Sequence, residues 1–259
     1  MLSEADRQTT RRIFGADDAQ IERDHLISHV LAAVSHDVGE QVAFFGGTAL
    51  ARTFLTDGRL SEDLDLIALG HRTEVGEALA RTITRHLARD FGRPTYSPSF
   101  TSTRGAEAVN VVFPSGPRLQ IQLLPSDHYP AWPFERRELV QRYSDAGPAN
   151  LLVPTFDAFV AWKTVTYMDR RAPRDLWDLA AIAEFRPFTP GAASLFAKFG
   201  PHRSLPTNAT IPSAPDVASW SHHLAHQTRL TISAQQARDR VVRAWVDLEH
   251  ASGTAVREQ

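Results

Sequence analysis

Two aspartates, Asp63 and Asp65, alternate with Leu64 and Leu66 in an apolar stretch of the chain. Successive side chains of a β-strand point to opposite faces, so a strand here would project both carboxylates from one face. Paired carboxylates offer the hard oxygen ligands that Mg²⁺ prefers, and this ion can bridge protein to substrate phosphates. An isolated pair is more often an exposed strand edge, so a metal site for phosphoryl or nucleotidyl transfer needs support from neighbouring residues.

A glycine pair, Gly46-Gly47, lies between the short apolar run 42–45 and a helix-forming segment that begins at Thr48. Small residues at a strand-to-helix turn let the backbone approach a ligand, and the helix N-terminus offers unpaired N–H groups to an anion. Taken alone, the turn is better explained by tight packing. Because a helix and then the strand with Asp63 and Asp65 follow it, the combination predicts a triphosphate cradle beside the metal ligands.

A second charged block combines Lys163 and Arg170 with Asp175 and Asp178. Lys163 and Arg170 are seven residues apart and so lie near one another on a helical face, where they could meet a triphosphate as a point charge and a planar fork. The alternative is structural, because acids at a helix N-terminus are stabilised by its dipole and Arg174 with Asp178 forms an ordinary i,i+4 ion pair. The residues alone leave both interpretations open.

Both blocks resemble motifs of a known family. Residues 44–66, FFGGTALARTFLTDGRLSEDLDL, resemble the first motif of nucleotidyltransferases related to DNA polymerase beta, and specifically of the AbiEii/AbiGii toxin family that includes the MenT toxins. Arg59, Ser61, Asp63 and Asp65 occupy the places of its Arg-x-Ser-x-Asp-x-Asp pattern. Residues 162–182, WKTVTYMDRRAPRDLWDLAAI, are similar to the family's helical motif of a lysine, arginines and Arg-Asp-x-x-Asp-Leu. The resemblance spans residues 20–200.

The resemblance implies a metal-dependent nucleotidyltransferase toxin that moves NMP from an NTP to an RNA acceptor, the 3' end of tRNA, and so blocks translation. It implies Mg²⁺ or Mn²⁺ as cofactor and a cognate antitoxin as partner. A small-molecule nucleotidyltransferase of the aminoglycoside-modifying kind is the alternative enzyme. The residues it implies are the catalytic groups Asp63, Asp65, Lys163 and Asp175, the last as a candidate base; the metal ligands Asp63 and Asp65; and the nucleotide or phosphate contacts Gly46, Gly47, Thr48, Arg59, Ser61, Lys163 and Arg170.

One strand departs from the pattern of the superfamily. Many members place a third acid on a neighbouring strand, but the candidate strand here carries Gln120 and Gln122. Three arrangements are open: a second ion held by Asp63, Asp65 and substrate, a site completed by Asp175, or a single ion. The amides also motivate a non-catalytic relative that binds nucleotide or a partner without turnover.

Ser61 has two interpretations. In some MenT toxins the equivalent serine resembles the target of an inhibitory kinase-like antitoxin, and a phosphate here would add roughly 1.5 to 2 negative charges beside the carboxylates. The alternative is a serine that hydrogen-bonds locally or contacts the phosphate of the substrate.

The composition limits the class of protein. The chain has 259 residues, of which 42% are hydrophobic, so a folded core is expected. The formal net charge of -2 means that a nucleic acid must be met by a local patch of positive charge. The absence of cysteine excludes disulfides, thiolate metal sites and cysteine nucleophiles. With no signal peptide or membrane-spanning apolar segment in view, we expect a cytoplasmic protein without a membrane partner.

Hydrophobic periodicity predicts the elements that position these residues. Strands are expected at 42–45, 60–69, 108–113 and 118–124, the last two as a hairpin, and helices at 18–36 and 73–90. The proline-containing region 125–154 is expected to be an inter-domain connection, followed by helices at 156–169, 174–184 and 234–248. Together with the resemblance, this predicts an α+β fold: a polymerase-beta-like nucleotidyltransferase domain over 1–130, with a mixed sheet flanked by helices, and a mainly helical C-terminal domain over 131–259.

Overall fold

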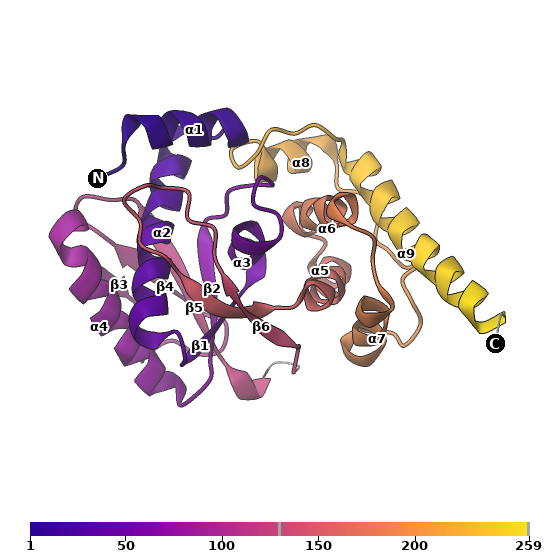
Figure 1. Ribbon diagram of the computed structural model, residues 1–259, viewed down its shortest axis with the longest axis horizontal. Helices are drawn as coiled ribbons and strands as arrows, with labels where there is room; N and C mark the ends of the chain where they lie inside the picture. Colours follow the sequence, from indigo (N-terminus) through magenta and orange to yellow (C-terminus); the bar gives the residue numbers. More distant parts are fainter. Residues whose placement is uncertain (129–130, 258–259) are drawn as a thin grey trace. The chain divides into compact units, whose positions relative to one another are not determined.

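A seven-stranded mixed sheet forms the centre of the first of two compact units, Met1–Val153 and Pro154–Gln259, in the computed structural model, which describes residues 1–128 and 131–257 (Figure 1). The strand order is β3-β4-β5-β2-β1-β7-β6. Strand β1 pairs antiparallel with β2 and parallel with β7, β2 pairs parallel with β5, and β4 pairs antiparallel with both β5 and β3. The strands are β1 (Val42–Phe45), β2 (Asp63–Ala68), β3 (Thr95–Ser97), β4 (Ala108–Val112), β5 (Arg118–Pro125), β6 (Phe134–Glu138) and β7 (Asn150–Pro154).

The two faces of the β2–β5 pair differ in character. Leu64 of β2 is in register with Ile121 of β5, and Leu66 with Leu123, and all four are buried. On the opposite face, Asp63 and Asp65 are in register with Gln120 and Gln122, and the next pair along, Ile67 with Leu124, is apolar and buried. One side of this strand pair is therefore apolar throughout, whereas the other is polar at the start of β2, where the two aspartates lie.

The first unit also contains helices, of which α2, α3 and α4 contact the sheet and α1 packs on α2. They are α1 (Glu4–Phe14), α2 (Asp18–Val38), α3 (Gly46–Thr53) and α4 (Arg72–Phe91), with a short 3-10 helix η1 (Ser126–His128). The side chains of Ser3 and Asp17 cap α1 and α2 by accepting from backbone N–H groups of the first turn. Helices α2 and α4 pack against one another and against β5, whereas α3 contacts β1 and β2.

The second unit is helical. It contains α5 (Phe156–Arg170), α6 (Pro173–Phe185), α7 (Pro190–Phe199), α8 (Val217–Leu224) and α9 (Ala234–Arg257). Trp245 of α9 is fully buried, and its ring lies 5.1 Å from that of Phe188 and 5.5 Å from that of Phe196. Within the described residues, no helix is long and apolar enough to cross a membrane.

The structure confirms the predicted α+β fold but corrects the region 125–154. The prediction of a connection there is wrong, because β6 and β7 lie in it and extend the sheet of the first unit. For the same reason the compact units divide after Val153, later than the boundary expected between 130 and 131. The sequence analysis also missed the elements α1, β3, α7 and α8.

Candidate active site

The turn between β1 and α3 places the glycine pair against residues of the following loop and strand. Gly46 has a φ of 79°, a left-handed conformation that suits glycine because it lacks a Cβ. A Cβ built on Gly46 would overlap the carboxylate of Asp65. A Cβ on Gly47 would lie 2.5 Å from a terminal nitrogen of Arg59 and 3.3 Å from Oγ of Ser61. The two glycines therefore permit a close approach that other residues would block.

Strand β2 presents its two aspartates on one face. Asp63 and Asp65 are both half-buried, and they alternate with the fully buried Leu64 and Leu66. Asp65 is in register with Phe45 of β1, the residue immediately before the glycine turn. Two carboxylates on one partly exposed face are hard oxygen donors, so these residues fit a divalent cation such as Mg²⁺.

The other residues predicted to contact phosphate near this turn are buried, and Ser61 and Thr48 take part in hydrogen bonds. Arg59 and Ser61 are 4% and 7% exposed, and Nε2 of Gln20 donates to the carbonyl oxygen of Ser61 at 3.3 Å. The hydroxyl of Thr48 is buried and donates to the carbonyl oxygen of Asp63. Thr48 therefore ties the start of α3 to the strand that carries the aspartates.

Strand β5 places the two glutamines beside the aspartates. Gln120 is in register with Asp63 and Gln122 with Asp65, so amides and not a third acid stand beside the aspartates on this strand. Nε2 of Gln120 donates to Oδ1 of Asn110 at 3.2 Å, and Nε2 of Gln122 donates to the carbonyl oxygen of Ala106 at 2.5 Å. Both amides are thus bonded toward the side of β4.

A buried ion-pair network anchors α3, the helix that begins at the glycine turn. Arg52 of α3 is fully buried, and its Nη2 lies 2.8 Å from Oδ1 of Asp24 on α2. Nη1 of Arg142 lies 3.3 Å from the same oxygen, and the Tyr143 hydroxyl donates to Oδ2 at 3.0 Å. Burial lowers the pKa of Arg52 to about 10 even though Asp24 opposes this, which leaves the guanidinium charged near neutral pH. The sequence analysis missed this network, although an arginine among the small and apolar residues of α3 was a visible signal.

In the second unit, the turn between α5 and α6 gathers the second charged block. Helix α5 ends where Arg171 adopts a φ of 53°, and Pro173 starts α6, which needs no N–H donor at its first position. Nζ of Lys163 donates to Oδ1 of Asp175 at 3.1 Å and lies 2.7 Å from Oδ2 of Asp178. The guanidinium of Arg170 donates to both oxygens of Asp175, through Nε at 2.6 Å and Nη2 at 2.9 Å.

The two neighbouring cations determine the protonation state of Asp175. Asp175 is fully buried, which by itself raises the pKa of a carboxyl group. The charges of Lys163 and Arg170 and the hydrogen bonds that they donate outweigh burial and lower the pKa of Asp175 to about 2. A carboxylate this acidic, with both oxygens bonded to cations, is a weak proton acceptor. The geometry thus supports a role for Asp175 in orienting Lys163 and Arg170, rather than the role of general base that the sequence suggested.

The structure therefore gathers the predicted residues into two groups. Contacts within the first unit join the glycine turn to Arg59, Ser61 and Asp65, and Thr48 to Asp63. Contacts within the second unit join Lys163 and Arg170 to Asp175, with Asp178 as a further partner of Lys163.

The mixed sheet with flanking helices, followed by a helical unit, is the fold of nucleotidyltransferase toxins. The structure is similar to that of MenT4, a nucleotidyltransferase toxin from Mycobacterium tuberculosis H37Rv, with a TM-score of 0.66 and 21% sequence identity over 94% of this chain and 89% of that chain. An antigenic nucleotidyltransferase-like protein from Paracoccidioides brasiliensis has a TM-score of 0.41 and 16% identity over 68% of this chain and 87% of that chain. No curated protein sequence matches.

The family follows from the sequence match. The model of the family described as nucleotidyl transferase AbiEii toxin, type IV toxin–antitoxin system, matches residues 29–244. The chain belongs to this family of AbiEii toxins, and the resemblance inferred from the two motifs is confirmed.

Proposed function

We propose that the protein is a toxin that transfers NMP from an NTP to the 3' end of tRNA and thereby blocks translation. The family supports nucleotidyl transfer, and the acceptor is the part that the experiment below must test. In this reaction an acceptor hydroxyl loses its proton and its oxygen bonds to the α-phosphorus, while the bond from the α-phosphorus to pyrophosphate breaks.

The observation that carries the proposal is the close approach of the glycine turn to the aspartate strand. A turn with small residues at a helix N-terminus can hold phosphate oxygens, and it lies directly against Asp65, with Arg59 and Ser61 beside Gly47. In this proposal Asp63 and Asp65 hold Mg²⁺ or Mn²⁺. When bound, such an ion neutralises the phosphate charge that grows as pyrophosphate leaves.

We assign the phosphate contacts of the second unit to Lys163 and Arg170. Arg170 exposes 60% of its side chain while its guanidinium is held by Asp175, so it is both accessible and fixed in orientation. Lys163 is held between Asp175 and Asp178. In this assignment Asp175 is a positioning residue, because it acts through the two cations and not on the substrate.

A direct test is to incubate the purified full chain and Mg²⁺ with each α-labelled NTP and either total tRNA or a panel of aminoglycosides. The proposal expects label at the 3' end of tRNA, and prior oxidation of the terminal ribose diol to dialdehyde should abolish it. Label in an aminoglycoside and not in tRNA would replace the proposal with the small-molecule enzyme. The register of Gln120 and Gln122 beside the aspartates favours a third outcome, NTP binding without label in any acceptor, which would identify a non-catalytic relative.

We also propose that a cognate antitoxin controls the enzyme, as the toxin–antitoxin family suggests. Ser61 is 7% exposed, and a Cβ on Gly47 would lie 3.3 Å from its hydroxyl. A phosphate on Ser61 would place roughly 1.5 to 2 negative charges at the turn proposed to bind the triphosphate. Phosphorylation of Ser61 therefore stays a prediction, testable by mass spectrometry of protein co-expressed with a neighbouring kinase-like gene product.

A further inference from the structure

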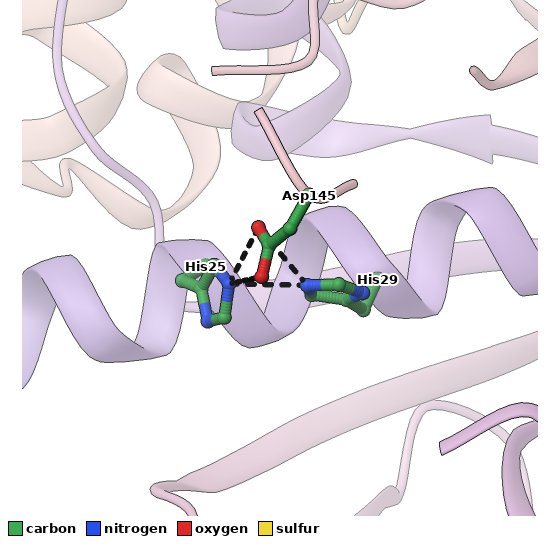
Figure 2. A group of neighbouring side chains, drawn as sticks. All are labelled: His25, His29 and Asp145. Carbon is green, nitrogen blue, oxygen red and sulfur yellow. Dashed lines mark hydrogen bonds and ion pairs between the residues drawn. The ribbon is translucent and has the colours of Figure 1, made fainter. Parts of the chain in front are cut away.

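Three side chains that commonly bind metals converge at a second place in the first unit. His25 and His29 stand one turn apart on α2, and Asp145 reaches them from the segment between β6 and β7 (Figure 2). Figure 2 shows both imidazoles and the carboxylate directed toward a common point. His25 is buried, and His29 and Asp145 expose 17% and 28% of their side chains. The cluster is therefore enclosed on one side and reachable from solvent on the other.

The distances within this cluster match those between ligands of one ion. Nε2 of His25 lies 3.0 Å from Nε2 of His29 and 3.0 Å from Oδ1 of Asp145, and Nε2 of His29 lies 3.5 Å from the same oxygen. Ligand atoms bound tetrahedrally to Zn²⁺ at their usual bond lengths are about 3.3 Å apart. Three atoms from two separate segments thus form one face of a tetrahedral coordination shell.

Hydrogen bonds alone satisfy these three side chains poorly. Nε2 of His25 carries either a proton or a lone pair, and it lies within hydrogen-bond distance of both Nε2 of His29 and the carboxylate of Asp145. With a proton it must share that single hydrogen between two acceptors. With a lone pair it faces the lone pairs of an ionised carboxylate. A cation between the three atoms would instead bind all three lone pairs.

One oxygen of Asp145 faces both imidazoles. Neutral imidazole and ionised carboxylate are the forms of these side chains that bind metals. The Met1 amino group lies 2.9 Å from Oδ2, whereas Oδ1 is the oxygen near both imidazoles.

We propose that His25, His29 and Asp145 bind a divalent transition-metal ion such as Zn²⁺. Two imidazoles with one carboxylate favour such ions over Mg²⁺, which prefers oxygen ligands. The group formed by His36, Asp37 and His86 is the weaker candidate within the described residues. There the guanidinium of Arg85 already pairs with the Asp37 carboxylate, and the His36 side chain is 75% exposed.

The ion would join the loop that carries Asp145 to α2. Two residues earlier, Tyr143 binds Asp24 of α2, and Arg142 donates to the carbonyl oxygens of Ala51 at 2.6 Å and Thr56 at 3.0 Å. The loop between β6 and β7 thus already contacts the end of α3. A metal ion bound by Asp145 would add a link from this loop to α2. The ion is therefore structural, distinct from the divalent ion at Asp63 and Asp65.

The test uses the full chain after treatment with a chelator, in buffer without nucleotide. Zn²⁺ binding is measured by equilibrium dialysis and by competition with a chromophoric chelator, and Co²⁺ binding by its visible absorption. The wild type should bind one Zn²⁺ tightly, should show the intense visible bands of tetrahedral Co²⁺, and should melt at a higher temperature with Zn²⁺. His29→Gln and Asp145→Asn should each weaken binding at least about tenfold, as loss of a ligand or its support commonly does.

Two control variants assign the ion to this cluster. His86→Gln removes a ligand of the alternative group, and Asp63→Asn removes a carboxylate of the candidate active site; both should retain wild-type affinity for Zn²⁺. Absence of tight binding in the wild type would overturn the proposal. So would wild-type affinity in folded His29→Gln and Asp145→Asn, or loss of the ion in either control. Because no nucleotide or acceptor is present, the result is independent of the transfer assay.

Discussion

At Gly46, backbone conformation and space restrict the residue together. Its φ of 79° disfavours any residue with a side chain, and an added Cβ would overlap Asp65. We expect Gly46→Ala to displace the carboxylate of Asp65 and to lower nucleotide transfer by at least about tenfold, with backbone strain of about 1 to 3 kcal/mol. Steady-state transfer rates and thermal melts measure the two effects.

Gly105→Ala is the matched control for Gly46→Ala. Gly105 also has a positive φ, of 51°, but an added Cβ there would meet nothing within 4 Å. It should therefore cost stability through strain alone and leave the transfer rate unchanged. Equal losses of activity in the two variants would show that the contact with Asp65 has no part in function.

The pKa of Asp175 predicts a contribution to stability that depends on pH. Because the folded-state pKa of about 2 lies below the ordinary value of 3.8, the contribution is complete above about pH 4 and is lost as pH falls toward 2. We expect the stability advantage of wild type over Asp175→Asn to shrink by about 2 kcal/mol between pH 5 and pH 2. Urea unfolding at a series of pH values measures it, and an advantage that does not change with pH would contradict the account.

At the level of single residues, the sequence predicted the face on which a side chain lies better than the distant residues that it contacts. The alternation of Asp63 and Asp65 with leucines is enough to place both on one face, and the strand register agrees. Burial of Asp175 between two cations depends on a helix turn that no local pattern reveals. Likewise, the His25–His29 spacing is visible in the sequence, but Asp145 lies 120 positions from His25, so only the fold brings them together.

At the level of elements, periodic segments were predicted well and short or polar ones poorly. Helix α2 and strand β1 were predicted nearly to their bounds because their apolar residues are continuous or periodic. Strand β6 reads FERRE and lies at the sheet edge, so it lacks an apolar face, and β7 was obscured by nearby prolines and glycines. Edge strands gain their structure from pairing with a distant neighbour, which a local pattern does not contain.

The ion-pair network at Asp24 joins α2, α3 and the loop after β6, so we expect its loss to lower the stability of the first unit. Asp24 is 1% exposed and neutralises the guanidinium groups of Arg52 and Arg142. Asp24→Asn should lower the free energy of unfolding by about 3 to 5 kcal/mol, because it leaves buried cations uncompensated. Denaturant unfolding provides the measurement.

Asp18→Asn on the same helix is the control for Asp24→Asn. Asp18 pairs with Arg7 and Arg11 but exposes 58% of its side chain, so its loss should change stability far less than the loss of Asp24. If the two variants were equally stable, the buried network would not be what anchors α3.

At the level of the whole molecule, the proposed function uses two aspartates of the first unit, Asp63 and Asp65, and two cations of the second unit, Lys163 and Arg170. Lys163 lies in the second unit. We expect Lys163→Gln to raise the KM for NTP by at least about tenfold, because the triphosphate loses its contact with one positive charge. Lys198→Gln, on α7 of the same unit, should leave the KM unchanged. A folded Lys163→Gln protein with the wild-type KM would remove Lys163 from the proposed phosphate contacts.

We propose that nucleotidyl transfer depends on the carboxylates of Asp63 and Asp65 as ligands of the divalent ion. The most direct measurement is the rate of label transfer from an α-labelled NTP to total tRNA by wild type, Asp63→Asn and Asp65→Asn, with melting temperatures recorded for each. Glu62→Gln is the control, because Glu62 directly precedes Asp63 in the sequence and pairs with Arg23 at 3.0 Å. The account expects both aspartate variants to be folded and slower by at least about 100-fold, with Glu62→Gln near wild type. Wild-type rates in either folded aspartate variant would contradict it.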